Sequence, residues 1–112
     1  MDLTVEKIEN IAVVSFPKVD LDSDVATAFR LQMEKLLDEE NRVVIDMSGV
    51  QFIDSSGLGA IVACLRKLQS RGGRLKLCCM NETVKDIFHL VRINKVFDIL
   101  DTRQEAIQHI QD

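Results

Sequence analysis

The sequence predicts an α/β protein with a mostly parallel central sheet, and three observations support this class. After an N-terminal hairpin, segments with strand character alternate with segments whose apolar residues recur at helical spacing. The uninterrupted apolar run at 43–45 is typical of a central strand that is covered on both faces. The chain of 112 residues is long enough for one core and contains no repeat or linker. We therefore expect a single domain over residues 1–112, with an N-terminal antiparallel strand and about four helices.

Five segments have the composition and length of strands. Two of them form the N-terminal hairpin through a turn at Glu9-Asn10, and Pro17 ends the second. The later strands are separated by helical segments, which favours parallel pairing through right-handed crossovers. The expected order is β-β-α-β-α-β-α-β-α. The strands are expected over residues 3–5, 11–16, 42–47, 75–79 and 96–100.

Four segments carry apolar residues at intervals of three and four, as one buried face of a helix requires. Ser23 or Asp24 is the expected N-cap of the first helix and Asn81 that of the third, while Thr102 and Glu105 form a capping box before the fourth. The expected inward residues are Ala26, Phe29, Met33, Leu36 and Leu37 in the first helix, Leu58, Ile61, Val62, Leu65 and Leu68 in the second, Val84, Ile87, Phe88 and Val91 in the third, and Ala106, Ile107 and Ile110 in the fourth.

Charge and composition exclude several classes of function. The net charge is -4, the pI is near 5.1 and there is no Trp or Tyr, which argues against binding to nucleic acid. The N-terminus lacks the basic start and apolar core of a signal peptide. The longest apolar stretch, near residues 58–65, is far too short to span a bilayer. We expect a cytoplasmic protein without a membrane partner.

The cysteines do not indicate a disulfide framework or a metal site. Cys64, Cys78 and Cys79 are odd in number, and two of them are adjacent. No cysteine or histidine spacing suits zinc. A redox-sensitive pair is one interpretation of Cys78 and Cys79, but neither has a basic neighbour in sequence that would lower its thiol pKa. We therefore expect reduced, small apolar cysteines, with no metal and no cofactor.

The most informative segment is Asp54-Ser55-Ser56-Gly57-Leu58-Gly59, which joins the apolar run 50–53 to the second helix. It places a serine hydroxyl where backbone N–H groups are free and the helix dipole is positive, so a phosphate there is favourably placed. One interpretation is a plain helix cap with glycines for a tight turn. The other is a phosphorylation switch, supported by three polar residues where one cap suffices and by a glycine that leaves the turn open.

The same segment does not indicate catalysis. A nucleophilic serine needs a neighbouring base and the G-x-S-x-G elbow is absent, while the two histidines, His89 and His109, lie on expected C-terminal helices. Gly57-Leu58-Gly59 lacks the Gly-Lys-Ser/Thr ending of a phosphate-binding loop. Scattered aspartates on turns are typical of solvated or capping residues and not of a magnesium site. We therefore expect a protein that is not an enzyme.

The stretch from Val43 to Gly59 resembles the central signature of STAS domains, in particular that of the bacterial anti-sigma factor antagonists. Leu21-Asp22-Ser23 matches the early Leu-Asp turn of that family, and Arg71-Gly72-Gly73 matches the loop before its next strand. The chain departs from many members because no glycine precedes the Leu-Asp turn, which leaves the identity of the partner open. The resemblance implies a STAS-like fold over nearly the whole chain.

The resemblance also implies partner switching. The unphosphorylated protein would bind an anti-sigma factor that is also a serine kinase, and a sigma factor would be freed. The kinase would use its own ATP and magnesium to phosphorylate Ser55, which blocks binding, and a PP2C-type phosphatase would reverse the step. The alternative is a non-switching STAS scaffold or sensory module that binds another regulator or a small ligand. A monomer or weak dimer is expected.

The residues expected to contact the partner surround Ser55. Asp54 is expected to orient the turn, Ser56 to cap the second helix, and Gly57 with Leu58 to provide the apolar contact. The full set of expected partner-binding residues is Asp22, Ser23, Asp54, Ser56, Gly57 and Leu58.

Overall fold

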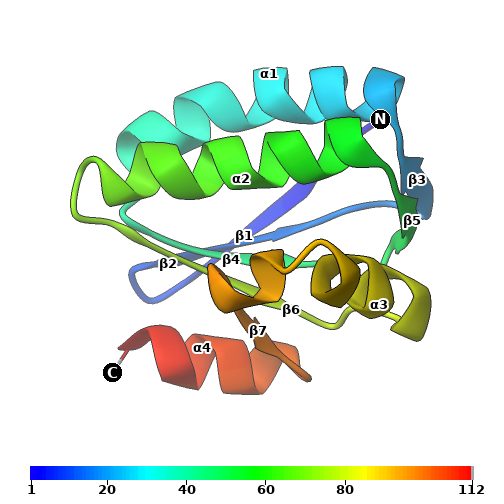
Figure 1. Ribbon diagram of the computed structural model, residues 1–112. Coiled ribbons are helices and arrows are strands. Elements are labelled where there is room, and N and C mark those ends of the chain that lie inside the picture. The colour runs from blue at the N-terminus through cyan, green and yellow to red at the C-terminus, as the bar shows by residue number, and fades with distance from the viewer. Residues whose placement is uncertain (112) are drawn as a thin grey trace.

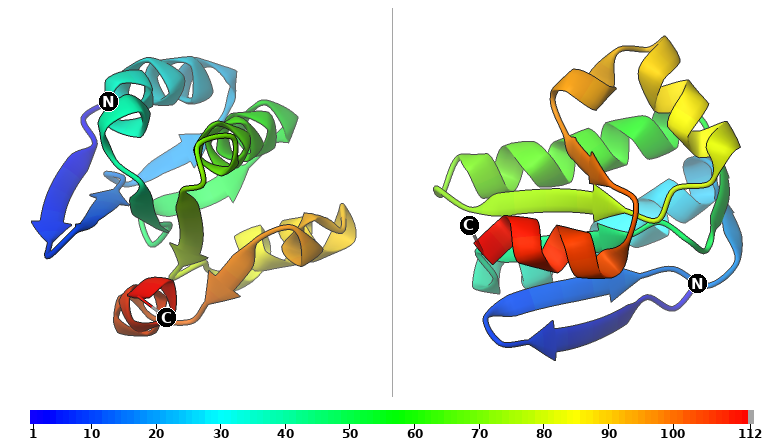
Figure 2. Two further views of the ribbon diagram at one scale, coloured as in Figure 1. Left: turned by 90° about the vertical axis from the view of Figure 1, so that its left-hand side faces the viewer. Right: turned by 90° about the horizontal axis from the view of Figure 1, so that it is seen from below.

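The computed structural model describes residues 1–111 and contains a five-stranded main sheet in the order β1-β2-β4-β6-β7 (Figures 1 and 2). The N-terminal hairpin pairs β1 with β2 antiparallel, and all other neighbours in this sheet are parallel. The expected mixed sheet is therefore confirmed. Its strands are β1 (Thr4–Ile8), β2 (Ile11–Ser15), β4 (Arg42–Asp46), β6 (Arg74–Cys78) and β7 (Asp98–Leu100).

Helices cover both faces of this sheet. Figure 1 shows α1 and α2 together on one face and α4 on the other. The central strand β4 reflects this arrangement, because Val43 and Ile45 pack in the larger core under α1 and α2 while Val44 packs in the smaller core under α4. The prediction of a central strand covered on both faces is confirmed. The helices are α1 (Ser23–Glu39), α2 (Ser55–Gln69), α3 (Glu82–Leu90) and α4 (Arg103–Gln111), with a 3-10 turn η1 (Ile93–Lys95) after α3.

A second, two-stranded sheet was absent from the expected order. It pairs β3 (Val19–Leu21) with β5 (Val50–Ile53) in parallel, and Leu21 lies beside Ile53 in the register. The two strands have three and four residues, too few for an alternating pattern to distinguish them from a loop. Each of these short strands leads directly into a helix, β3 into α1 and β5 into α2.

Two details of the first helix and the last strand also differ from expectation. The N-cap of α1 is Asp22, not Ser23 or Asp24, because the Asp22 backbone is extended and its carboxylate accepts from the backbone N–H of Val25. The last strand begins only at Asp98 and not at residue 96. The backbone N–H groups of Val96 and Phe97 donate to the carbonyl of Ile93, so these two residues continue the turn of η1.

The caps of the two C-terminal helices agree better with expectation. Asn81 caps α3 through the backbone N–H of Val84 at 2.8 Å, as predicted. The Thr102 hydroxyl accepts from the backbone N–H of Glu105 at 3.1 Å at the start of α4, also as predicted. Val91, however, lies after the end of α3 and is 46% exposed, so its expected inward position is wrong. Within residues 1–111, no helix combines the length and apolar character needed to cross a bilayer.

Candidate functional site

The small sheet brings two Asp-Ser pairs to one end of the molecule. Asp22-Ser23 follows β3 and Asp54-Ser55 follows β5, and the backbone N–H of Asp54 donates to the carbonyl of Leu21 at 3.3 Å. In Figure 1 both helices begin at this end, beside the labels of β3 and β5. The two turns that contain the expected partner-binding residues therefore lie at one surface.

Asp54 shapes the start of α2. Its backbone is extended, its carboxylate accepts from the N–H of Gly57 at 3.0 Å, and its carbonyl accepts from the N–H of Leu58 at 2.9 Å. The expectation that Ser56 caps the helix is wrong, since Ser56 is the second residue of α2 and a cap must precede the first turn. The carboxylate thus does the capping, and the side chains of Ser55 and Ser56 are both exposed.

The start of α1 repeats this geometry. The Asp22 carboxylate accepts from the N–H of Val25 at 3.0 Å, and the Asp22 carbonyl accepts from the N–H of Ala26 at 2.7 Å. Ser23 is the first residue of the helix, as Ser55 is in α2, and both Asp22 and Ser23 are exposed. Two helix N-termini, each with an exposed serine, therefore face the same surface.

Gly57 lies in the interior, so the expected contact between this residue and a partner is corrected. A Cβ at Gly57 would lie 2.4 Å from the carbonyl oxygen of Leu21 and 2.7 Å from the side chain of Ile53. The glycine therefore lets the first turn of α2 pack against the small sheet and does not open the turn to a partner. Leu58, the second expected apolar contact, is half-buried and packs partly against the core.

Sequence reasoning missed one exposed residue near this surface. Phe52 on β5 is 47% exposed, although it lies in an apolar run whose other apolar members, Val50 and Ile53, are buried. An exposed aromatic ring is a common anchor for a protein partner. Its exposure could not be predicted, because a strand of four residues carries too little pattern to show that Phe52 is exposed while Val50 and Ile53 are buried.

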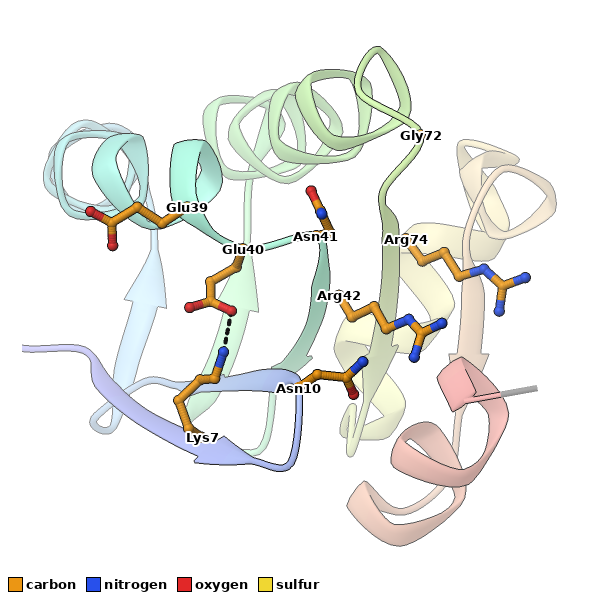
Figure 3. Close-up of a pocket in the computed structure, with 8 residues that line it drawn as sticks. All are labelled: Lys7, Asn10, Glu39, Glu40, Asn41, Arg42, Gly72 and Arg74. Atoms are coloured by element: carbon orange, nitrogen blue, oxygen red, sulfur yellow. Dashed lines mark hydrogen bonds and ion pairs between the residues drawn. The ribbon is translucent and has the colours of Figure 1, made fainter.

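A polar cavity of about 460 Å³ lies at the opposite ends of the parallel strands (Figure 3). Arg42 and Arg74, the first residues of β4 and β6, line it, and Lys7 forms an ion pair with Glu40 at its side. None of the expected partner-binding residues contributes to this cavity. The candidate site is therefore separate from this cavity, and its exposed side chains suit contact with a protein partner.

The family model for the STAS domain matches residues 2–106. The chain belongs to the STAS domain family. This STAS domain is 31% identical over 107 residues to a Thermotoga maritima protein described as a candidate anti-sigma factor antagonist, with 94% of this chain and 95% of that protein covered. The resemblance that residues 43–59 carry is thereby confirmed.

Two solved structures have the same fold as this chain. An anti-sigma factor antagonist from Mycobacterium paratuberculosis is 26% identical, superposes with a TM-score of 0.89, and is covered over 99% of this chain and 94% of that chain. The Bacillus cell fate determinant SpoIIAA, solved in its phosphorylated form, is 20% identical with a TM-score of 0.74, and the match covers 97% of this chain and 99% of that chain. The STAS domain thus has relatives that are anti-sigma factor antagonists, a regulatory class of proteins.

Proposed function

We propose that this STAS domain is an anti-sigma factor antagonist that works by partner switching. Its unphosphorylated form binds an anti-sigma factor with serine kinase activity and so frees a sigma factor, and phosphorylation of Ser55 ends this binding. The observation that carries the proposal is the exposed Ser55 hydroxyl at the start of α2, held by the Asp54 cap beside a second capped helix.

The chain contributes a positioned hydroxyl to the transfer, and the kinase contributes the rest. The Ser55 oxygen attacks the γ-phosphorus of the kinase's ATP, ADP leaves, and the hydroxyl proton passes to a base of the kinase. The kinase also supplies magnesium. The exposure of Ser55 meets the main requirement of this step, because a foreign active site must close around the acceptor. A PP2C-type phosphatase restores the hydroxyl.

The phosphate is compatible with the fold. It adds about -1.5 to -2 charge at pH 7 and stands at a helix N-terminus, where free N–H groups and the dipole favour an anion. Beyond the capping carboxylate of Asp54, the first turn of α2 adds no acidic residue that would repel the phosphate. The domain is therefore expected to keep its structure when it is phosphorylated.

The same phosphate is incompatible with a docked partner. At the interface it would be desolvated, and the carboxylates of Asp22 and Asp54 lie on the same surface. A penalty of about 3 kcal/mol weakens binding more than 100-fold. We assign the partner contact to Asp22, Ser23 and Ser56, with Phe52 and Leu58 in place of Gly57 as its apolar part.

Binding to the kinase and phosphate transfer test this proposal together. Ser55→Asp is expected to reduce affinity for the anti-sigma factor more than 100-fold, as measured by calorimetry, with an unchanged circular dichroism spectrum. Ser55→Ala is expected to bind and to accept no phosphate. Ser70→Ala is the matched control, because Ser70 is exposed at the opposite end of α2, and it is expected to keep both binding and phosphate transfer to Ser55. Stoichiometric phosphorylation of Ser55→Ala would contradict the assignment.

A non-switching scaffold or sensory module is the second candidate, and the polar cavity is the observation that favours it. Arg42 and Arg74 lie side by side in the register of β4 and β6 and both line the cavity, which suits a small anion. This function predicts that an anion binds and that Ser55→Asp leaves partner binding unchanged. The Ser55→Asp measurement therefore separates the two candidates.

A further inference from the structure

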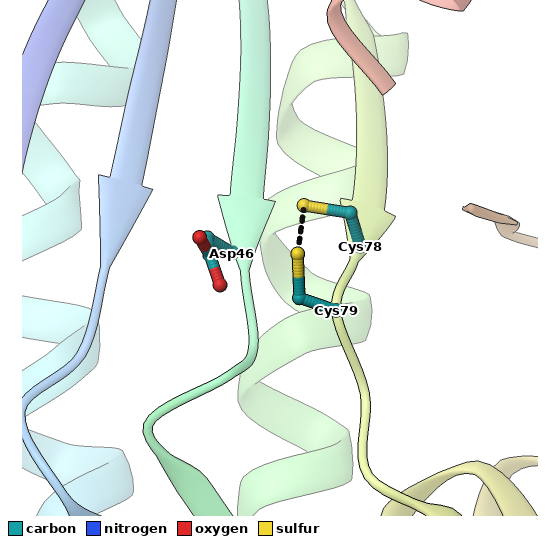
Figure 4. Close-up of side chains that lie close together, drawn as sticks. All are labelled: Asp46, Cys78 and Cys79. Carbon is teal, nitrogen blue, oxygen red and sulfur yellow. Dashed lines mark hydrogen bonds between the residues drawn. The ribbon is translucent and has the colours of Figure 1, made fainter. Parts of the chain in front are cut away.

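Two cysteine sulfurs lie side by side at the carboxyl end of β6. Successive side chains of a strand normally point to opposite faces. Cys79 follows the last residue of β6, Cys78, and has a φ of +65°, in the left-handed region that non-glycine residues rarely adopt. This bend puts both sulfurs on the same side, where the Cys79 thiol donates to the Cys78 sulfur at 3.4 Å (Figure 4).

A carboxylate completes the cluster. Asp46 is the last residue of β4 and lies beside Cys78 in the parallel register. One carboxylate oxygen and the two sulfurs all lie within 4.8 Å of one another, and Figure 4 shows the three side chains near the carboxyl ends of β4 and β6. Asp46 is only 6% exposed and Cys79 is half-buried, so the cluster is enclosed but reachable from its Cys79 side.

The carboxylate is held in place by groups outside the cluster. One oxygen accepts from the backbone N–H of Ser48 at 2.9 Å, and the other accepts from the Arg103 guanidinium at 2.9 and 3.0 Å. Burial raises the pKa of Asp46, but these hydrogen bonds outweigh burial, and the net pKa is lowered. The group is therefore a charged and oriented acceptor on which further oxygen lone pairs remain free.

Packing as a small apolar residue accounts for two of the three cysteines but not for Cys79. Cys64 is buried in the larger core and Cys78 in the smaller core. Cys79, in contrast, is half-buried and has a strained backbone.

We propose that Cys78, Cys79 and Asp46 form a binding site for a soft divalent cation of the zinc type. Two sulfurs bound at 2.3 Å to a tetrahedral zinc lie about 3.8 Å apart, which is 0.4 Å more than the 3.4 Å of the pair in the structure. Sulfur and carboxylate are both ligands that zinc accepts, and the fourth position is open on the Cys79 side to water.

The charges balance when the cation binds. Each thiol gives up its proton to solvent, and the two thiolates with the Asp46 carboxylate carry three negative charges. The cation supplies two positive charges and Arg103 the third, so that a neutral cluster remains in the interior. Arg103 thus keeps its bond to Asp46 and acts as the outer partner that orients a ligating carboxylate.

Cadmium is the probe for this site, because thiolate-to-cadmium charge transfer absorbs in the ultraviolet. The reduced full chain, treated with a chelator and kept anaerobic, is titrated with Cd²⁺ and then with Zn²⁺ in competition. We expect one saturable equivalent per chain that zinc displaces. Cys79→Ser is expected to lose the band while keeping its circular dichroism spectrum, and the control Cys64→Ala is expected to keep the band.

Arg103→Gln gives a second readout that does not remove a ligand. Loss of an outer partner is expected to weaken metal affinity about 10- to 100-fold with the charge-transfer band retained at saturation. The proposal is overturned if no saturable band forms, if the band persists in Cys79→Ser, or if it needs two chains for each metal ion. It is also overturned if mild hydroperoxide joins Cys78 to Cys79 in the metal-loaded chain as readily as in the metal-free chain.

Discussion

The first turns of α1 and α2 share one cap geometry and differ in charge. In each, an extended aspartate accepts a hydrogen bond at 3.0 Å from the backbone N–H three residues later, and an exposed serine is the first helical residue. The turn in α1 also contains the acidic residue Asp24, whereas the turn in α2 contains none. The positive end of α2 is therefore less compensated, which makes Ser55 a better place for a phosphate than Ser23.

The two turns also differ in packing. At the third helical position α1 has Val25, a half-buried side chain, and α2 has the buried Gly57, whose Cα lies against the carbonyl of Leu21. The start of α2 is thereby fixed to the small sheet. A phosphate-dependent switch requires an exposed hydroxyl at a helix N-terminus that is held in place and carries little negative charge beyond its cap. The cap geometry is common to both helices, so the packing of Gly57 and the absence of an acidic residue after Asp54 distinguish α2.

The largest expected effect concerns this packing. Gly57→Ala places a methyl group 2.4 Å from the carbonyl oxygen of Leu21, a backbone atom that cannot move aside without disturbing β3. We expect the free energy of unfolding to fall by about 2 kcal/mol or more, as measured by urea denaturation. Gly59→Ala is the matched control, because its nearest neighbour would be the Arg30 side chain at 3.6 Å. It should stabilise the helix by roughly 0.5–1 kcal/mol, and equal effects at both positions would contradict the packing difference.

The second effect concerns the caps. Replacing a capping aspartate by alanine typically costs about 1 kcal/mol. Asp54 is half-buried and Asp22 is exposed, so Asp54→Ala is expected to cost more than Asp22→Ala. Asp54→Ser and Asp22→Ser keep an oxygen at the cap and should lie within a few tenths of a kcal/mol of the parent. If Asp22→Ala lowered the free energy of unfolding more than Asp54→Ala, the Asp54 cap would not be the more important of the two.

The smallest effect concerns charge. Ser55→Asp should stabilise the isolated domain by about 0.3–1 kcal/mol through the dipole, and Ser23→Asp by less, because Asp24 already lies in that turn. The dipole lowers the folded-state pKa of the new carboxyl, so the gain is present above pH ~4 and is lost as pH falls through that lowered pKa. Thermal unfolding at low and high salt checks both points, and a gain that salt does not reduce would exclude the dipole as its cause.

Local pattern predicted most of the fold. Most of the expected inward residues of α1 and α2 lie buried, and Leu36, Leu58 and Val62 are half-buried. Helical spacing is a property of consecutive residues and is therefore readable from the sequence. The continuous apolar run of β4 likewise predicted a strand with two covered faces. The Asp-Ser-Ser-Gly-Leu-Gly segment was recognisable because its residues act together within one turn.

The details of the site depend on contacts between distant residues. Whether Asp54 or Ser56 caps α2 follows from the backbone direction at the end of β5, which pairing with β3 sets. The burial of Gly57 depends on where Leu21 lies, and that residue belongs to the same pairing. Three or four residues per strand carry too little pattern to predict such a pairing.

The sequence by itself determined the helices, the central strand, the STAS family and the serine at the start of a helix. Each of these features depends on neighbouring residues or on a compact motif. Only the tertiary structure decided that the Asp54 carboxylate caps that helix, that Gly57 is interior, and that Asp46 lies beside Cys78 and Cys79. The physical reason is that these contacts depend on how strands far apart in the chain are paired. That pairing is determined by packing and by backbone hydrogen bonds over the whole sheet.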